Sequence, residues 1–131
     1  MNQQILPATA MDADGDFVVV WQSFLQDNDN YGIYAQRYNA AGDALGGEFR
    51  VNTFTTGLQN NPSVGMDADG DFVVVWASPH DGNSYGVFAQ RYNAVGAPQG
   101  SEVRVTDLLC PVEHERRRAA STAVVAVAKW I

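Results

Sequence analysis

The amino-acid sequence predicts an all-β protein that contains two copies of one repeat, each folding into four antiparallel strands. The first observation is an unbroken duplication, because residues 11–21, MDADGDFVVVW, recur as residues 66–76. The second is a near-duplication, because residues 32–39, GIYAQRYN, recur as GVFAQRYN at residues 86–93. The third is composition, since runs of β-branched and aromatic residues alternate with segments rich in Gly, Asp and Asn, as strands alternate with tight turns.

The first two strands of the second repeat are expected at residues 61–66 and 72–76. Pro62 favours an extended conformation for its predecessor and suits the start of a strand. Between the strands, Gly70 supplies the positive φ angle that a tight hairpin needs. Residues 72–76, FVVVW, are a continuous apolar run, which indicates a strand that is covered on both faces.

The third and fourth strands are expected at residues 86–92 and 102–106. Turn residues 93–96 close the third strand, and residues 102–106 alternate between polar and apolar, as in a half-exposed outer strand. The first repeat matches throughout. Its strands are expected to begin at Pro7 and then to cover residues 17–21, 31–38 and 48–52.

The length of the repeat favours a β-propeller. The two blocks recur after 66 − 11 = 55 and 86 − 32 = 54 residues, and four antiparallel strands in about 55 residues are typical of a propeller blade. A stacked β-solenoid and a β-sandwich of both repeats are alternatives. Since known rings contain about four to eight blades, the chain is expected to be a fragment of a longer array or one protomer of a ring of several copies. An open half-ring would expose apolar flanks and aggregate.

The sequence predicts a division into residues 1–58 as the first blade, 59–106 as the second and 107–131 as an off-pattern tail. Trp130 follows Trp76 by 130 − 76 = 54 residues, in phase with the repeat. A diverged start of a third repeat is therefore one of three equally weighted interpretations of the tail. A helix and a disordered end are alternative interpretations of the same residues.

Composition excludes some partners. The formal net charge of −7 argues against nucleic acid, because phosphate binding needs clustered Lys and Arg. The single cysteine, Cys110, rules out a disulfide within the chain and leaves the compartment open. No segment resembles a signal peptide, and no apolar run of about 18 residues is present to span a bilayer. An exported form would need its export signal elsewhere in a longer protein.

Three blocks resemble the tandem repeats of large secreted or surface-attached bacterial proteins: FVVVWQS at 17–23, YGIYAQRYNAAG at 31–42 and GGEFRVNT at 46–53. Those proteins often carry hemolysin-type calcium-binding or cadherin-like modules elsewhere. The resemblance covers residues 4–106 and implies an extracellular or cell-surface, non-catalytic array with a propeller fold. This chain departs from the family in having two copies, an off-pattern tail, and neither an export signal nor a glycine- and aspartate-rich calcium nonapeptide.

Each repeat places three carboxylates in its first turn, where oxygen donors suit Ca²⁺. They are Asp12, Asp14 and Asp16 in the first repeat and Asp67, Asp69 and Asp71 in the second. An EF-hand loop is not matched, because Phe17 and Ser23 stand where that motif needs Gly and Glu. An ordinary hairpin turn explains the same residues and is favoured, with a calcium site as the alternative.

Ligand contacts are expected in the loops that differ between the repeats, around residues 27–30 and 81–84. Arg37 and Arg91 occupy equivalent places beside Gln36 and Gln90. These arginines could line a channel that binds a ligand. The favoured interpretation is structural, in which each arginine is buried and paired with an Asp or with backbone carbonyls. The aromatic rings of Trp21, Trp76, Tyr34 and Tyr38 suit sugar stacking but are favoured as packing. The candidate ligand residues are Asp27, Asp29, Asp81, Asn83, Tyr34, Arg37 and Arg91.

The sequence predicts no enzyme, because it contains no nucleophile elbow, phosphate-binding Gly-rich loop or His-Glu-x-x-His motif. Duplicated turns also place their carboxylates in identical environments, whereas a glycosidase pair needs different ones. The expected function is a non-enzymatic structural or adhesive module of a large exported bacterial protein. The alternative is a self-associating lectin-like or calcium-binding module with one site per repeat. The expected partners are further repeats, in a longer chain or by homo-oligomerisation, and a glycan or protein ligand.

Overall fold

The computed structural model describes residues 3–24, 31–53, 59–78 and 86–106. These residues form eight strands: β1 Gln4–Met11, β2 Phe17–Phe24, β3 Tyr31–Tyr38, β4 Ala44–Arg50, β5 Asn60–Met66, β6 Phe72–Ser78, β7 Gly86–Tyr92 and β8 Val103–Thr106. The prediction of an all-β fold is confirmed for them. They include no helix, and therefore none long and apolar enough to cross a membrane.

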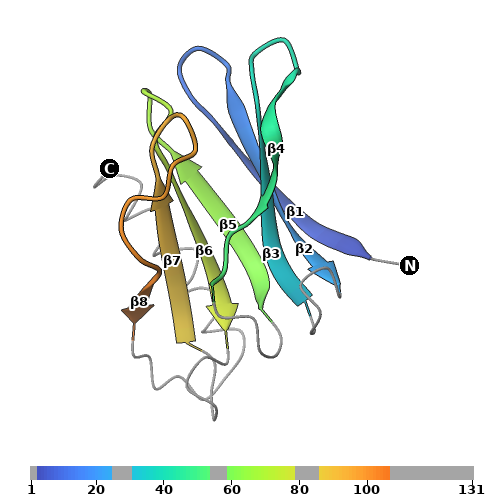
Figure 1. Ribbon diagram of the computed structural model, residues 1–131, viewed down its shortest axis with the longest axis vertical. Helices are drawn as coiled ribbons and strands as arrows, with labels where there is room; N and C mark the ends of the chain where they lie inside the picture. Colours follow the sequence, from blue (N-terminus) through green and yellow to red (C-terminus); the bar gives the residue numbers. More distant parts are fainter. Residues whose placement is uncertain (1–2, 25–30, 54–58, 79–85, 107–131) are drawn as a thin grey trace.

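Each repeat forms one antiparallel sheet with its strands in chain order, β1-β2-β3-β4 and β5-β6-β7-β8. Figure 1 shows the two sheets next to each other, with β5 lying against the first sheet. Duplicated residues occupy the same places: Val20 pairs with Ala35 in the first sheet, and Val75 pairs with Ala89 in the second. The repeat in sequence is therefore a repeat in structure.

The first hairpin of each sheet turns through the expected glycine. Gly15 and Gly70 have φ angles of 93° and 94°, which only glycine adopts at no steric cost. The turn is closed in both copies by the same backbone bond, from the N–H of Asp12 to the carbonyl of Asp16 and from that of Asp67 to that of Asp71, each 2.9 Å long. The prediction for Gly70 is confirmed.

The first strand of each sheet contains a β-bulge at the same place. Leu6 and Asn61 lie in these bulges, and both have a φ angle of 54°. Each precedes a proline, which has no N–H for the sheet and is tolerated at a bulge. The prediction that Pro62 keeps Asn61 extended is wrong, because the bulge places Asn61 in the left-handed region.

Several strand limits also differ from the prediction. The fourth strand of the first sheet begins at Ala44 and ends at Arg50, rather than covering residues 48–52. Val51 and Asn52 still bond to the third strand beyond this end, since Val51 donates its N–H to the Ile33 carbonyl and the Asn52 side-chain oxygen accepts the Ile33 N–H. The first strand begins at Gln4 rather than at Pro7, and β8 begins one residue later than predicted.

The core lies between the two sheets and joins unlike faces of equivalent strands. Successive side chains of a strand point to opposite faces. We call the face with Val18 and Val20 and the equivalent face with Val73 and Val75 the forward faces, and the opposite ones the rear faces. The forward face of the first sheet meets the rear face of the second. The buried cluster between them contains Val18, Val20, Ile33, Ala35, Val51, Phe72, Val74, Trp76, Phe88 and Tyr92.

The two inner strands are covered to different extents. Phe72, Val73, Val74, Val75 and Trp76 are all 0% exposed, so the prediction of burial on both faces is confirmed for residues 72–76. In the first repeat, Val18 and Val20 are fully buried, but Phe17, Val19 and Trp21 are only half-buried. The same prediction is wrong for residues 17–21, because the second sheet covers only their forward face.

This difference predicts unequal costs for one substitution at two equivalent positions. Val74→Ala removes two methyl groups from a fully buried site and should lower the free energy of unfolding by about 2 kcal/mol. Val19→Ala removes the same groups from a half-buried site and should cost about half as much. Urea unfolding of both variants tests this expectation, and equal losses would contradict the packing described.

Candidate functional site at the junction of the two repeats

Polar contacts join the repeats at the hairpin end of the junction. The Arg37 guanidinium donates from Nη1 to the carbonyl of Ala94, 3.0 Å away, and the N–H of Ala13 points to the carbonyl of Ala68 at 3.5 Å. Gly96, with a φ angle of 84°, leaves room for this arginine, because an added Cβ would lie 2.7 Å from Arg37 Nε. The third strand of one repeat thus holds the last turn of the next.

Two further contacts join the repeats elsewhere along the junction. The side-chain oxygen of Gln22 accepts the Asn61 N–H at 3.2 Å. The Glu102 carboxylate accepts both the N–H and the hydroxyl of Thr53, each at 2.9 Å. Sequence reasoning missed these contacts. For the contact of Gln22, the sequence offered one clue. The two repeats differ at this position, since Gln22 corresponds to Ala77 in the second copy.

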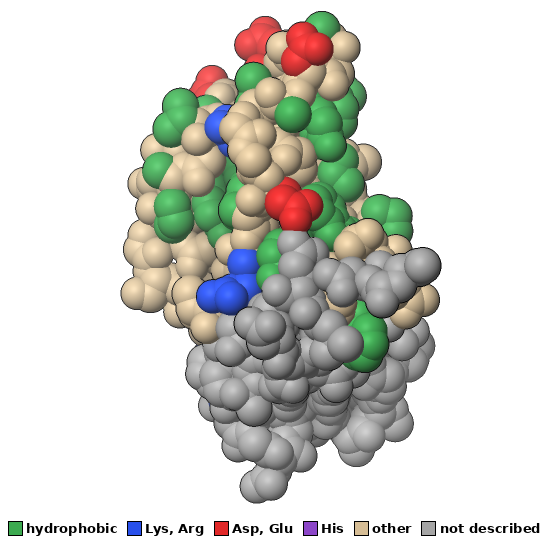
Figure 2. All heavy atoms as spheres, turned by 45° about the vertical axis from the view of Figure 1, so that its right-hand side comes forward, with side chains coloured by type: hydrophobic (Ala, Val, Ile, Leu, Met, Phe, Trp, Pro, Cys, Tyr) green, Lys and Arg blue, Asp and Glu red, His purple; other side chains and the backbone are tan. Residues whose placement is uncertain are grey.

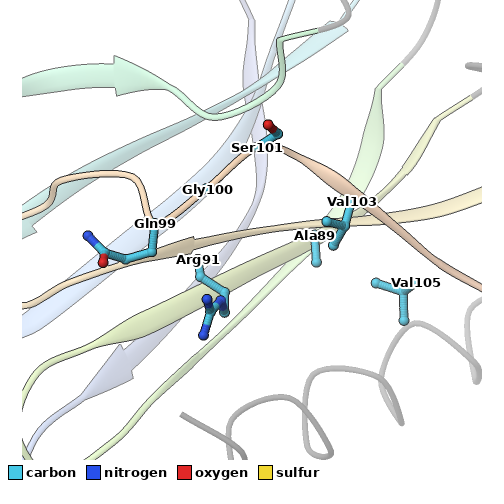
Figure 3. A pocket seen from close by; sticks show the side chains of 7 residues that line it. All are labelled: Ala89, Arg91, Gln99, Gly100, Ser101, Val103 and Val105. Atoms are coloured by element: carbon cyan, nitrogen blue, oxygen red, sulfur yellow. The ribbon is translucent and has the colours of Figure 1, made fainter.

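The two repeated arginines have different surroundings. Arg37 is half-buried and bonded to the next repeat. Arg91 is exposed and lines a hollow of about 440 Å³ on the forward face of the second sheet. In Figure 3 the side chains around this hollow come from β7, β8 and the segment before β8. They are Ala89, Arg91, Gln99, Gly100, Ser101, Val103 and Val105.

The first aspartate of each turn bonds its own backbone. Asp12 Oδ1 accepts the N–H groups of Asp14 and Asp16 at 2.9 and 3.0 Å. Asp67 Oδ1 accepts the equivalent pair from Asp69 and Asp71, both at 3.0 Å. This pattern is an Asx turn, in which the side chain takes the place of a backbone carbonyl.

Asparagines do the same in the second turn of each repeat. Asn39 Oδ1 accepts the N–H groups of Ala41 and Asp43, and Asn93 Oδ1 accepts those of Val95 and Ala97. A neutral amide oxygen therefore makes the same two bonds as the carboxylates of Asp12 and Asp67. The turns need an acceptor at this place, and the negative charge is not required for these bonds.

The acidic residues of the turns nevertheless gather at one end of the molecule, as the red side chains at the top of Figure 2 show. Asp12, Asp14, Asp16 and Asp69 line a hollow of about 110 Å³ together with Arg37. Asp16 Oδ1 also accepts the N–H of Ala40. Within residues 3–24, 31–53, 59–78 and 86–106, no group of three or more His, Cys, Asp or Glu is arranged to hold a metal ion.

The aromatic candidates lie mostly in packed positions. Tyr34 is 6% exposed and Trp76 0% exposed. Tyr38 stacks on Phe17 with ring centroids 5.0 Å apart, and Tyr92 stacks on Phe72 in the same way at 4.9 Å. Trp21 is half-buried, and its indole N–H has no hydrogen-bond partner within the part of the chain that the structure describes.

The remaining candidate ligand residues, Asp27, Asp29, Asp81 and Asn83, lie outside the described residues.

Two repeated glutamines have a structural role that sequence reasoning missed. Gln36 donates from Nε2 to the carbonyls of Arg37 and Gly46, and Gln90 makes the equivalent bonds to Arg91 and Gly100. They link the third strand to the segment that begins the fourth. The sequence did contain a signal for this role, because a polar residue recurs at the same place in a mainly apolar strand of both repeats.

Tyr92 is a buried titratable group at the junction. It is 4% exposed, and burial raises the pKa of its hydroxyl far above 10.0, with a further contribution from the negative charge of Glu102. The hydroxyl therefore stays neutral in the folded chain. Its ring contacts Phe49 of the first repeat with a centroid distance of 5.3 Å, so ionisation would place a charge inside the contact between repeats.

Substitution of the turn aspartate separates its two interpretations. Asp12→Asn keeps the acceptor oxygen and should leave the free energy of unfolding nearly unchanged, whereas Asp12→Ala loses two hydrogen bonds and should cost about 1–2 kcal/mol. Urea unfolding with and without millimolar calcium checks this. A calcium-dependent gain in stability that Asp12→Asn abolishes would instead assign a metal-binding role to the turn.

The raised pKa of Tyr92 predicts a loss of stability at high pH. Above pH 10 the unfolded chain loses the tyrosine proton while the folded chain keeps it, so the free energy of unfolding should fall by about 1.4 kcal/mol per pH unit. Below pH 10 both states keep this proton, so the free energy of unfolding should not depend on pH through Tyr92. Thermal unfolding from pH 8 to 11 measures the fall, and Tyr92→Phe should remove it. An unchanged slope in that variant would refute the assignment.

Comparison with known proteins gives a slight structural likeness. No family model matches the chain, and no curated protein matches it. The fold is similar to part of the crystal structure of an endo-arabinase from Bacteroides thetaiotaomicron, with a TM-score of 0.45 and 14% sequence identity. The match covers 79% of this chain and 42% of that chain. A likeness this slight is no evidence for a shared activity.

Proposed function

We propose that the chain is a non-enzymatic structural or adhesive module of the β-propeller type, and part of a large exported bacterial protein. The observation that carries the proposal is the junction, in which the forward face of one repeat buries the rear face of the next. Because the junction joins unlike faces, it is of the head-to-tail kind that can extend to further units. Each repeat has a forward face and a rear face, so each could contact one repeat on either side in a longer array.

Burial supports a propeller rather than a two-sheet sandwich. In a sandwich each sheet buries one face and turns polar residues to solvent on the other. Here β6 is buried on both faces, and the outward face of β2 carries Phe17, Val19 and Trp21. The equivalent first strands β1 and β5 also lie against each other, as first strands do in neighbouring blades round a common axis. Rings of this kind close with about four to eight blades.

Two observations support a scaffold rather than an enzyme. The sequence contains none of the catalytic motifs considered above, and the carboxylates of Asp12 and Asp67 accept hydrogen bonds from the backbone of their own turns. The scaffold would present the loops 27–30 and 81–84 to a glycan or protein ligand. Location outside the cell rests on the resemblance of residues 4–106 to repeats of exported proteins. Its partners would be further repeats of the same kind, in a longer chain or in further copies.

Addition of repeats tests the proposal. A chain in which residues 3–106 are present twice in tandem should have a higher free energy of unfolding than the original, because a new junction covers a face that was half-exposed. Urea unfolding of both chains measures the difference. The control is the same tandem chain with a long Gly/Ser-rich linker between the two copies. If the increase in the free energy of unfolding comes from contact between the copies, this chain should keep most of it.

An activity assay provides the opposing outcome. The original and tandem chains should give no turnover on a broad panel of glycosides and polysaccharides. Turnover above background that follows the purified protein would contradict the proposal of a non-enzymatic module. Equal stability of the original and tandem chains would contradict its structural basis.

A further inference from the structure

The rear face of the first repeat carries nearly the same residues as the rear face of the second, which lies against the forward face of the first. In Figure 1 the second sheet lies on one side of the first sheet, so the described strands leave the rear face of the first sheet without such a neighbour. We propose that this face docks the forward face of a further repeat, which precedes the first one in a longer array. The inference rests on the proposed function, since it assigns the surface that receives such a repeat.

The residues of this face are more exposed than their copies in the second repeat. Met11 is 62% exposed, whereas the equivalent Met66 packs against the buried core. Val19 is half-buried, whereas the equivalent Val74 is 0% exposed. The same difference separates three aromatic residues from their copies, namely Phe17, Trp21 and Tyr38 from Phe72, Trp76 and Tyr92. Since each pair is of one residue type, the difference comes from the neighbouring repeat, which covers the second copy.

The indole of Trp21 gives this face a polar requirement as well. Its N–H is shielded from water and has no hydrogen-bond partner in the part of the chain that the structure describes. A buried donor without an acceptor destabilises the folded chain. A docked repeat that brings an acceptor to this N–H therefore adds a polar contact to the apolar one.

The last turn of the first repeat has room for the polar contact of the junction. Within the chain, Arg37 donates to the carbonyl of Ala94 and lies beside Gly96. The equivalent residues of the first repeat, Ala40 and Gly42, are exposed, and a Cβ added to Gly42 would meet no atom within 4 Å. An arginine of the docked repeat can therefore donate to the Ala40 carbonyl as Arg37 donates to that of Ala94.

The internal junction specifies the face that the docked repeat presents. Small apolar side chains should stand at the places of Val18, Val20 and Ala35, since these pack against the rear face of the second repeat. An arginine should stand at the place of Arg37, because its charge-assisted bond to a carbonyl fixes the register of the contact. A copy of the first repeat meets both requirements and serves as the probe.

An extended chain tests the docking. Residues 3–57 are placed ahead of residue 3 of the full chain, which keeps the period of 66 − 11 = 55 residues, and the added copy carries Trp21→Phe. The original Trp21 should then lose most of its quenching by acrylamide, because the docked repeat covers the indole. Trp76 is buried, and Trp76 and Trp130 are present in both chains, so the difference from the original chain reports on Trp21.

Met11→Lys blocks the docking while sparing the chain as it stands. Because Met11 is 62% exposed, lysine should leave the urea unfolding of the original chain nearly unchanged. In the extended chain the lysine lies in the covered face and should restore the quenching of Trp21 to its original level. Val95→Lys, at a 71% exposed site of the second repeat, is the matched control and should change neither chain.

Gly42→Asn blocks the place of the arginine instead. Asparagine tolerates the φ angle of 89° at this position better than most residues, and its side chain would occupy the space that the guanidinium needs. Quenching of Trp21 should therefore rise in the extended chain. Gly46→Asn is the control, since Gly46 also has a positive φ angle and no atom within 4 Å of an added Cβ. Circular dichroism checks that each variant is folded.

Three results would overturn the docking. The first is equal quenching of Trp21 in the original and extended chains. The second is an effect of Met11→Lys in the extended chain that is no larger than that of Val95→Lys. The third is protection of Trp21 in the original chain as its concentration rises, because the face would then bind a second copy.

The docking and the proposed function fail in different ways. A tandem chain that gains stability, together with an extended chain in which Trp21 stays open to acrylamide, would remove the docking and leave the proposed module. Turnover on glycosides would remove the proposed function and leave the protection of Trp21 as measured.

Discussion

The structure depends on the mutual burial of unlike faces between the two repeats. A four-stranded sheet of this length has apolar side chains on both faces and cannot bury either alone. The second sheet supplies the cover for Val18 and Val20, and the first sheet supplies it for Phe72, Val74 and Trp76. The polar contacts of the junction then fix the register of this packing. Arg37, Gln22 and Glu102 each bond to a group in the other repeat.

The duplicated residues of the turns bond to the backbone of their own hairpins. Asp12 and Asn39 make the same pair of backbone bonds in different turns, so a carboxylate and an amide are equivalent there. Repetition of a residue therefore has two causes in this chain. It marks a local turn requirement at the aspartates, and it marks a requirement of the neighbouring repeat at Arg37 and Gly96.

The sequence was sufficient to predict the all-β class, the four strands of each repeat and the hairpin glycine, because these follow from local patterns of two to eight residues. It was not sufficient for the bulges, since a left-handed Leu6 contradicts its local preference and is held by the surrounding strand pairs. The junction contacts were also missed. Thr53 and Glu102 lie far apart in the chain, and no local pattern indicates that they meet. The ring and its axis stay a prediction.

The bulge at Leu6 has a consequence for the order in which the chain opens. A branched, 49% exposed side chain is held there at a φ angle of 54°, a conformation that costs an ordinary residue about 1–3 kcal/mol. Asn61 occupies the same geometry in the second repeat with less penalty. β1 is also an edge strand, hydrogen-bonded on one side by β2. The N-terminal strand therefore stores more strain than its copy β5, and we expect the amide hydrogens of β1 to exchange with solvent by local opening before those of β5.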